Sequence, residues 1–284
     1  MSETSLFQAN EVHVGQDVGS RAFRVDDAAV ARYVAGTGGA PGVPAFVPAL
    51  AYHSECYRDL SWYLPNLIGN LHARQEWELF APLRLGDEVR SRTTVVERYR
   101  KRNRNYVVAE VLLTDAAGRW LQRSRTHQSF LAEEPADELV VDRERERRAD
   151  RRFTPPTGDG EDVALPPRTI THAMCEAFSG PVRNYHTDVE MARALGFPDI
   201  VVQGMMSVCF VADLLTARYG GGFVAGGKLD VRLVNVVWPG DAITSRGKVR
   251  EVVAEGTRRR AHLDVWCEKP DGTVTVIGTA SALA

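Results

Sequence analysis

The chain has 284 residues, 44% of them hydrophobic, and its 35 basic and 37 acidic side chains give a formal net charge of −2. This composition is typical of a globular protein, and the length suits two domains that each bury a core. The balanced charge excludes a global field that recruits nucleic acid or an anionic membrane. The sequence has no apolar run of about 20 residues and no basic, apolar leader, so we expect a cytoplasmic protein.

The first half of the chain predicts a helical stretch around residues 30–35, a glycine-rich loop and then β-strands. Residues 107–112 are rich in β-formers and precede a turn at Gly118, which predicts an antiparallel hairpin. The pair Gly86 and Asp87 suits a tight turn, because glycine tolerates positive φ and aspartate bonds nearby amides.

The same strand pattern returns in the second half at a constant displacement of 154 residues. The repeated residues are Gly86, Asp87, Ser91, Arg92, Val95 and Gly118, which recur as Gly240, Asp241, Ser245, Arg246, Val249 and Gly272. Six identities at one offset indicate two copies of one domain. Residues 262–266 before Gly272 then form the second hairpin.

A charged, proline-bearing segment lies between the copies and includes the run 142–148. Mixed charges without apolar periodicity indicate a solvated linker, with a basic patch for a phosphate-bearing ligand as the alternative. We therefore expect an N-terminal repeat over 1–135, a linker over 136–165 and a C-terminal repeat over 166–284. The four cysteines (Cys56, Cys175, Cys209 and Cys267) are far apart, which predicts reduced core thiols and no zinc site.

The second copy also predicts a long apolar helix that opens at Gly204 and ends before Gly220. Its apolar residues follow a 3.6-residue spacing: Met205, Val208, Cys209, Ala212 and Leu215. A helix so apolar must be covered on most sides. We expect an α+β double hotdog, with two antiparallel sheets each wrapped around a central helix.

The region around His186 resembles a known family signature. The residues that carry the resemblance are Phe178, Ser179, Gly180, Pro181, Val182, Arg183, Asn184, Tyr185, His186, Thr187 and Asp188, then Ala192, Gly196, Phe197, Ile200, Val201, Val202, Gln203, Gly204 and Met205. They resemble the hydratase motif of the MaoC-like dehydratases, which include the R-specific enoyl-CoA hydratases. Pro239, Gly240, Asp241 and Gly247 are similar to a second block of that family.

The resemblance implies a lyase without a cofactor, a hydratase or dehydratase acting on an enoyl or 3-hydroxyacyl thioester of CoA or an acyl carrier protein. His186 matches the family histidine, and an imidazole that titrates near neutrality suits general acid–base work. Gly204 matches the helix start whose free amides meet the developing oxyanion, where glycine would let the ligand approach closely.

The sequence departs from the family at the position of its catalytic aspartate, which is Pro181 here. Asp188 is our candidate substitute, although Thr187 and Glu190 form a capping-box pattern that explains an acidic first turn. Glu176 is a second candidate, ten residues before His186. Candidate substrate-binding residues are Arg183, Asn184, Tyr185, Gln203 and Met205, and an exposed Arg183 without a ligand stays open.

The first copy has Arg32 at the position equivalent to His186, so we expect it to complete a substrate tunnel. Five aromatic residues are candidates to line the tunnel or to pack the core: Phe46, Tyr52, Tyr57, Trp62 and Tyr63. His53 and His72 are expected to be structural, and no histidine spacing predicts a metal site. Other functions stay open, namely a thioesterase, isomerase or cyclase, or a non-catalytic acyl-thioester-binding subunit. A homodimer is open as well.

Overall fold

The computed structural model describes residues 12–39, 47–58, 70–101, 104–131 and 153–284, and all statements about structure refer to them. The first half contains β1 Asp17–Arg24, α1 Asp27–Thr37, α2 Glu55–Arg58, β2 Leu71–Leu79, β3 Glu88–Lys101, β4 Arg104–Asp115 and β5 Trp120–Leu131. The second half contains β6 Glu161–Ala164, β7 Arg168–Thr169, α4 His172–Ser179, α5 Val189–Ala194, α6 Gly204–Tyr219, α7 Gly221–Val224, β8 Lys228–Leu233, β9 Ala242–Glu255, β10 Arg258–Glu268 and β11 Val274–Leu283.

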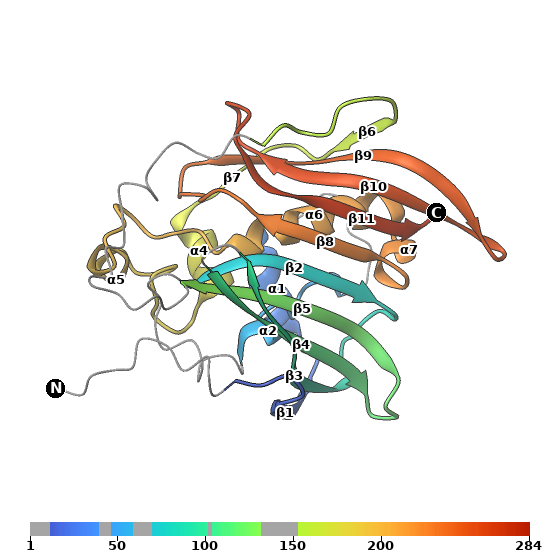
Figure 1. The fold of residues 1–284 in the computed structure, drawn as a ribbon, viewed down its shortest axis with the longest axis horizontal. Coiled ribbons are helices and arrows are strands. Elements are labelled where there is room, and N and C mark those ends of the chain that lie inside the picture. The colour runs from blue at the N-terminus through green and yellow to red at the C-terminus, as the bar shows by residue number, and fades with distance from the viewer. Residues whose placement is uncertain (1–11, 40–46, 59–69, 102–103, 132–152) are drawn as a thin grey trace.

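The strands form one continuous sheet and not the two separate sheets that we expected. The order is β1-β3-β4-β5-β2-β8-β11-β10-β9-β6, with β7 also paired to β9 (Figure 1). The two halves are joined where β2 pairs antiparallel with β8, from Arg74 opposite Arg232 to Glu78 opposite Lys228. Each half would otherwise leave this strand as an open edge with unpaired backbone groups, and the pairing removes both edges.

The repeat predicted from the sequence appears as a repeated strand frame. β3 and β9, β4 and β10, and β5 and β11 each begin 154 residues apart. In the β2–β8 ladder, Glu76 lies opposite Asp230, which is the residue at that same displacement, so the local two-fold axis passes here. A bulge leaves Val96 unpaired in β3 and Arg250 unpaired in β9, again 154 residues apart. Shared bulges are a feature of related domains, and this one supports the two copies.

The turns between the strands also follow the prediction. Gly86 and Gly240 have φ of 89° and 93°, and Gly118 and Gly272 have φ of 80° and 84°. These values lie in the left-handed region that favours glycine. The glycines repeated in the sequence are therefore repeated turns.

The predicted linker is partly strand. Glu161–Ala164 forms β6, which pairs with β9 from Glu161 opposite Val249 to Ala164 opposite Arg246. The strand was missed because it is short and mostly exposed, so it has no apolar periodicity. Residues 136–152 of the predicted linker lie outside the described residues.

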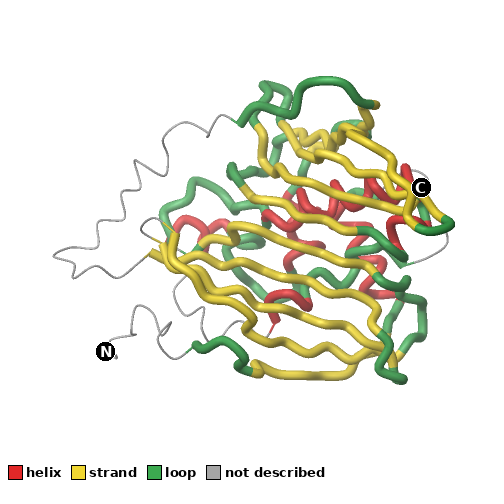
Figure 2. The backbone as a smooth tube through the Cα atoms, turned by 45° about the vertical axis from the view of Figure 1, so that its right-hand side comes forward, coloured by secondary structure: helices red, strands yellow, loops and turns green. Residues whose placement is uncertain are grey.

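The helices cover one face of the sheet (Figures 1 and 2). Helix α6 has the predicted bounds, and twelve of its sixteen residues are buried. It packs against β9, β10 and β11, which makes it the central helix of the second half. In the first half, the described residues contain only the four-residue α2 at the corresponding place, so a second central helix is not part of the described structure.

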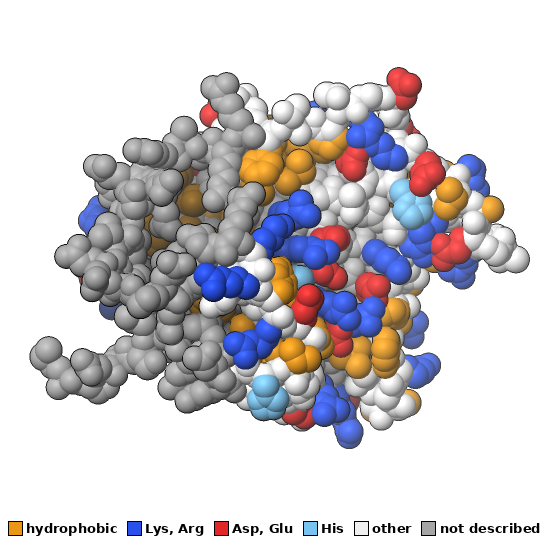
Figure 3. Space-filling view, in the orientation of Figure 1, with side chains coloured by type: hydrophobic (Ala, Val, Ile, Leu, Met, Phe, Trp, Pro, Cys, Tyr) orange, Lys and Arg blue, Asp and Glu red, His pale blue; other side chains and the backbone are white. Residues whose placement is uncertain are grey.

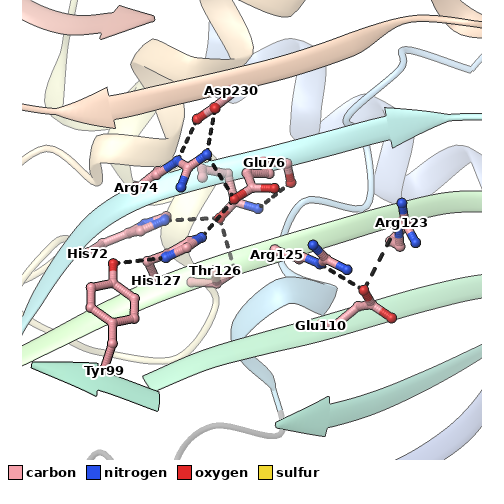
Figure 4. A network of polar contacts seen from close by, with 11 residues as sticks. His72, Arg74, Glu76, Tyr99, Glu110, Arg123, Arg125, Thr126, His127 and Asp230 are labelled. Atoms are coloured by element: carbon pink, nitrogen blue, oxygen red, sulfur yellow. Dashed lines mark hydrogen bonds and ion pairs between the residues drawn. The ribbon is translucent and has the colours of Figure 1, made fainter. Parts of the chain in front are cut away.

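The opposite face carries charged side chains of both signs over the junction of the halves (Figure 3). Arg74 donates to both oxygens of Asp230, each at 2.6 Å, and also lies 3.1 Å from Glu76. Glu76 accepts from His127 Nε2 at 2.9 Å, and Tyr99 lies 3.2 Å from the other ring nitrogen (Figure 4). This network ties β2, β5 and β8 together across the two copies.

Two further sequence predictions can be checked on the described residues. All four cysteines are buried free thiols, as expected. No helix in the described ranges is long and apolar enough to span a membrane.

Candidate active site

The loop that carries His186 follows α4 and is organised by one side chain, Asn184. Helix α4 starts at the N-cap Thr171, whose hydroxyl accepts from Met174 N, and it ends at Ser179. Asn184 Nδ2 then donates to the carbonyls of Ser179 (3.0 Å) and Val182 (2.7 Å), while its Oδ1 accepts from His186 N (2.8 Å). Asn184, a predicted substrate-binding residue, is thus engaged in positioning the loop.

The imidazole of His186 has one fixed partner. Its Nδ1 lies 2.6 Å from the carbonyl oxygen of Val201, and a carbonyl can only accept. Nδ1 therefore carries the proton, which leaves Nε2 of the neutral ring as an acceptor. Burial lowers the pKa of His186 to about 4, against a small opposing effect of the Val201 carbonyl. The ring is neutral at pH 7, and Nε2 has no partner among the described residues.

Aromatic rings pack behind His186 and hold it in place. The Tyr185 ring lies 3.9 Å from the His186 ring, centroid to centroid, and 6.4 Å from Phe197, which in turn approaches Trp238. Burial raises the pKa of Tyr185. Tyr185, which we expected to hold substrate or water, is positioned here as packing for the imidazole.

Asp188 caps helix α5, so the capping box that we predicted with Thr187 is wrong. Asp188 is the N-cap of α5 and accepts from Met191 N at 2.9 Å, whereas Thr187 Oγ1 accepts from Asn184 N inside the loop. Arg183 donates to Asp188 and lies 3.3 Å from Glu190. The hydrogen bond from Arg183 holds the pKa of Asp188 below its usual range. Asp188 is thus already bonded to Arg183 and to the first turn of α5.

The start of α6 presents backbone amides without a side-chain cap. Gln203 is the N-cap residue but makes no capping bond; its Oε1 accepts from Ser179 Oγ at 3.2 Å. The first-turn amides of a helix have no partner inside the helix and carry its positive dipole end. The Met205 side chain is fully buried in the core, so only its backbone can serve a ligand. Ser179 and Val201 link this helix start to the His186 loop.

Gly204 lies where helix α6 packs closely on β8, and the close approach of a ligand that we expected there stays a prediction. A Cβ built on Gly204 would lie 2.1 Å from Cδ2 of Leu233 on β8. Real side-chain atoms never approach so closely, so the leucine or the helix would have to move. Glycine thus lets α6 sit directly on β8.

Replacing Gly204 by alanine is expected to destabilise the fold by about 1–3 kcal/mol, the usual cost of overpacking. Urea unfolding of the purified variant measures this directly. Gly221→Ala is the matched control, because Gly221 is also in a helix and a Cβ there meets nothing within 4 Å. Equal unfolding free energies for the two variants would contradict the packing role.

Glu176, the second candidate substitute for the missing aspartate, is exposed. Among the described residues, no carboxylate is hydrogen-bonded to His186, and no group of three or more metal-ligating side chains is found. The residue that sequence reasoning missed is Val201. Its carbonyl fixes the tautomer of His186, but a backbone acceptor leaves no signal in residue type.

Two surface hollows lie away from this loop. One, of about 530 Å³, is lined by the β4–β5 turn and neighbours such as Arg84 and Trp120. The other, of about 320 Å³, lies between Tyr219 and Leu283. Neither contains residues of the His186 loop.

The predicted tunnel aromatics divide into two groups. Tyr52 accepts from Asp26 N at 2.8 Å and stacks on Phe23, so it packs the core. The Tyr57 hydroxyl lies within hydrogen-bonding distance of His53 Nδ1, at 3.2 Å. Phe46, Trp62 and Tyr63 lie outside the described residues.

The sequence of the second half matches a known domain family. Residues 157–264 match the MaoC like domain, and this range contains the His186 loop and the start of α6. The C-terminal half of the chain carries a MaoC-like domain. A search of curated proteins gives no match.

Solved structures with this fold extend the likeness to nearly the whole chain. A MaoC-like dehydratase from Phytophthora capsici is 17% identical with a TM-score of 0.69, covering 95% of this chain and 96% of its own. A conserved hypothetical protein from Mycobacterium tuberculosis, described as a double hotdog fold, is 13% identical with a TM-score of 0.60, covering 96% and 97%. The peroxisomal multifunctional enzyme type 2 of Drosophila melanogaster is 18% identical with a TM-score of 0.63; the match covers 93% of this chain and 48% of that one. At these low identities the likeness shows the fold alone, which is a double hotdog that includes the MaoC-like domain.

Proposed function

We propose that this protein is a hydro-lyase that adds water to a 2-enoyl thioester, or removes it from a 3-hydroxyacyl thioester, carried by CoA or an acyl carrier protein. The observation that supports this most is His186, whose Nδ1 is held by the Val201 carbonyl while Nε2 is left as a free base. The MaoC-like domain around it supports the same reaction class. A cytoplasmic location is also proposed, since four buried free thiols fit a reducing compartment.

In the hydration direction, His186 Nε2 takes a proton from water while the water oxygen bonds to C3. The electron pair of the C2–C3 double bond moves toward the thioester, whose oxygen becomes an enolate oxyanion. The backbone amides of Gly204 and Met205 at the start of α6 would stabilise that oxygen, because they lie at the positive end of the helix dipole; the next amide, of Met206, already donates to the Gln203 carbonyl at 2.8 Å. The protonated imidazole then returns the proton to C2, and the thioester carbonyl reforms. Dehydration is the same path in reverse.

One base serves both proton transfers in this proposal. Pro181 has no acidic group, and Asp188 is occupied by Met191 N and Arg183. The imidazole can do both, because the proton that it removes from water is the proton that it gives to C2.

The test is to incubate the protein with 2-enoyl-CoA esters of several chain lengths and to follow the loss of the conjugated thioester absorbance. Hydration is expected for at least one ester, with a 3-hydroxyacyl-CoA as the product. Absence of hydration with every ester, together with release of free CoA thiol, would replace the proposal with a thioesterase. Tight binding without any product would indicate a non-catalytic subunit.

The acid limb of the pH profile is expected near pH 4 and not near 6.5. His186 acts as a base only when it is neutral, and its pKa is lowered to about 4 by burial. Activity should therefore persist as the pH falls through 6.5 and should decline only near 4. The measurement is kcat/KM against pH, with circular dichroism at each pH to exclude unfolding. An acid limb at 6.5 with the fold intact would show an ordinary, solvated histidine.

A further inference from the structure

The start of α6 is held from outside the helix, unlike the starts of α1, α4 and α5, which are capped by a side chain. Asp26, Thr171 and Asp188 each accept from the backbone amide three residues later in those helices. Gln203, the N-cap residue of α6, makes no such bond. Its Oε1 accepts instead from the hydroxyl of Ser179, the last residue of α4, at 3.2 Å. A contact between two helices thus takes the place of a cap.

This arrangement leaves the first amides of α6 open. A cap normally satisfies an N–H group at a helix start that has no partner inside the helix. Among the described residues, no hydrogen-bond acceptor is found for the amide of Gly204 or of Met205. The bond to Ser179 occupies the Gln203 oxygen that would otherwise be the cap. The two amides are therefore available to an oxygen of a ligand.

Ser179 is bonded to the loop of the base as well. Its carbonyl accepts from Asn184 Nδ2 at 3.0 Å, and Asn184 Oδ1 accepts from His186 N at 2.8 Å. A second link joins the same segments, because Val201 accepts from His186 Nδ1 and donates through its own N–H to the Tyr185 carbonyl at 3.3 Å. One residue, Ser179, thus contacts the helix start with its hydroxyl and the His186 loop with its carbonyl.

The end of α4 gives Ser179 a firm support. The neighbouring Phe178 is 6% exposed and stacks on His53 of the first half, with ring centroids 4.0 Å apart and an interplanar angle of 8°. A Cβ built on Gly36 of α1 would lie 2.8 Å from Cβ of Phe178, so α1 and α4 are in close contact. A side chain on a packed helix end can hold its partner in one place, which the placement of reacting groups requires.

We propose that Ser179 is a positioning residue of the active site. Its hydroxyl acts through the Gln203 side chain and holds the start of α6 against the loop of His186. The amides of Gly204 and Met205 then meet the thioester oxygen while the imidazole reaches the reacting carbons. Small errors in placement are costly when two groups act on one substrate. The inference rests on the proposed function, which supplies the thioester oxygen.

The experiment measures recognition of the carbonyl oxygen without turnover. One probe is the dethia analogue of octanoyl-CoA, in which a ketone replaces the thioester and is neither hydrated nor cleaved. The other is the octyl thioether of CoA, which has no carbonyl oxygen, and each is titrated calorimetrically. The wild type is expected to bind the ketone about fivefold more tightly than the thioether, the size of one net hydrogen bond. Ser179→Ala should bring this ratio close to one.

Three further variants separate positioning from folding. Ser179→Thr keeps the hydroxyl and should restore the ratio. Gln203→Met removes the acceptor of that hydroxyl, so it should lower the ratio as far as Ser179→Ala does. Ser20→Ala is the matched control, because it makes the same chemical change at an exposed position of β1 and should leave the ratio unchanged.

A ratio unchanged in Ser179→Ala would overturn the proposal, and so would an equal weakening of both probes, which indicates a role in stability alone. A wild type that binds both probes equally, or binds neither, would overturn it too. Hydration of a 2-enoyl-CoA is measured separately, and its kcat should fall about tenfold in Ser179→Ala. A wild type that prefers the ketone but hydrates no 2-enoyl-CoA would contradict the proposed reaction and leave the role of Ser179 intact, so the two failures are distinguishable.

Discussion

Replacement of His186 by alanine is expected to lower kcat/KM for a 2-enoyl-CoA by about 10²–10⁴-fold, the usual contribution of a general acid–base residue. The loss should be at the high end, since the described residues place no carboxylate against the imidazole to replace it. The fold should remain, because the His186 side chain makes a single hydrogen bond, to Val201. Steady-state kinetics and the thermal unfolding midpoint test the two parts of this expectation separately.

Two further variants separate the base from its position. His186→Asn keeps an N–H that can donate to Val201 but removes the basic nitrogen, so it should be as inactive as alanine. His172→Ala is the matched control, because His172 is an exposed histidine whose ring is hydrogen-bonded to Asp199 at 3.1 Å, and this variant should keep full activity. Activity within tenfold of the wild type in His186→Ala would remove His186 from the chemistry.

The order of strands and turns in each half was predictable because the same residue types recur at the same positions of both copies. Glycines at turns and alternating β-formers survive in both copies, so the displacement of 154 residues found hairpins that the structure confirms. The union of β2 with β8 was not predictable. It depends on which edges meet in space, and Arg74 and Asp230 give no sign of this in sequence. The bulges at Val96 and Arg250 escaped for a similar reason, as they are a matter of backbone pairing.

The site was predictable only in its side chains. The motif led to His186 and to the helix start at Gly204, and the structure brings both segments together through Ser179 and Val201. The partner of the imidazole is a backbone carbonyl, and every residue has one, so the sequence could not indicate which carbonyl it would be. The cap of α5 was assigned to Thr187 where Asp188 caps, because adjacent capping residues compete and the turn closed by Asn184 takes the threonine. Competition of this kind is decided by local geometry.

A buried ion pair of the second copy, Arg168 with Asp213, is hydrogen-bonded to helix α1 of the first copy. Asp213, in the middle of α6, accepts from Arg168 Nη1 at 2.7 Å and from the Tyr33 hydroxyl at 3.0 Å. Arg168 also donates to the carbonyl of Thr37 and lies over the ring of Phe210. Burial raises the pKa of Asp213, and the nearby Arg168 opposes that shift. The central helix is thereby fixed to α1 of the other copy.

Replacement of Arg168 by methionine is expected to lower the free energy of unfolding by about 3–5 kcal/mol, since it leaves the carboxylate of Asp213 buried without its cation. The side chains of Arg168 and Asp213 are only 12% and 6% exposed, so water cannot take over the lost contact. The double variant Arg168→Met with Asp213→Leu removes both charges and should recover at least half of the loss. It should not recover all of it, because the Tyr33 hydroxyl then lacks its acceptor. Urea unfolding of the wild type, the single variant and the double variant measures these free energies.

A single variant that costs less than about 1 kcal/mol would mean that the pair behaves like a surface ion pair. A double variant no more stable than the single one would mean that the packing of the arginine on Phe210, and not its charge, holds the two copies together.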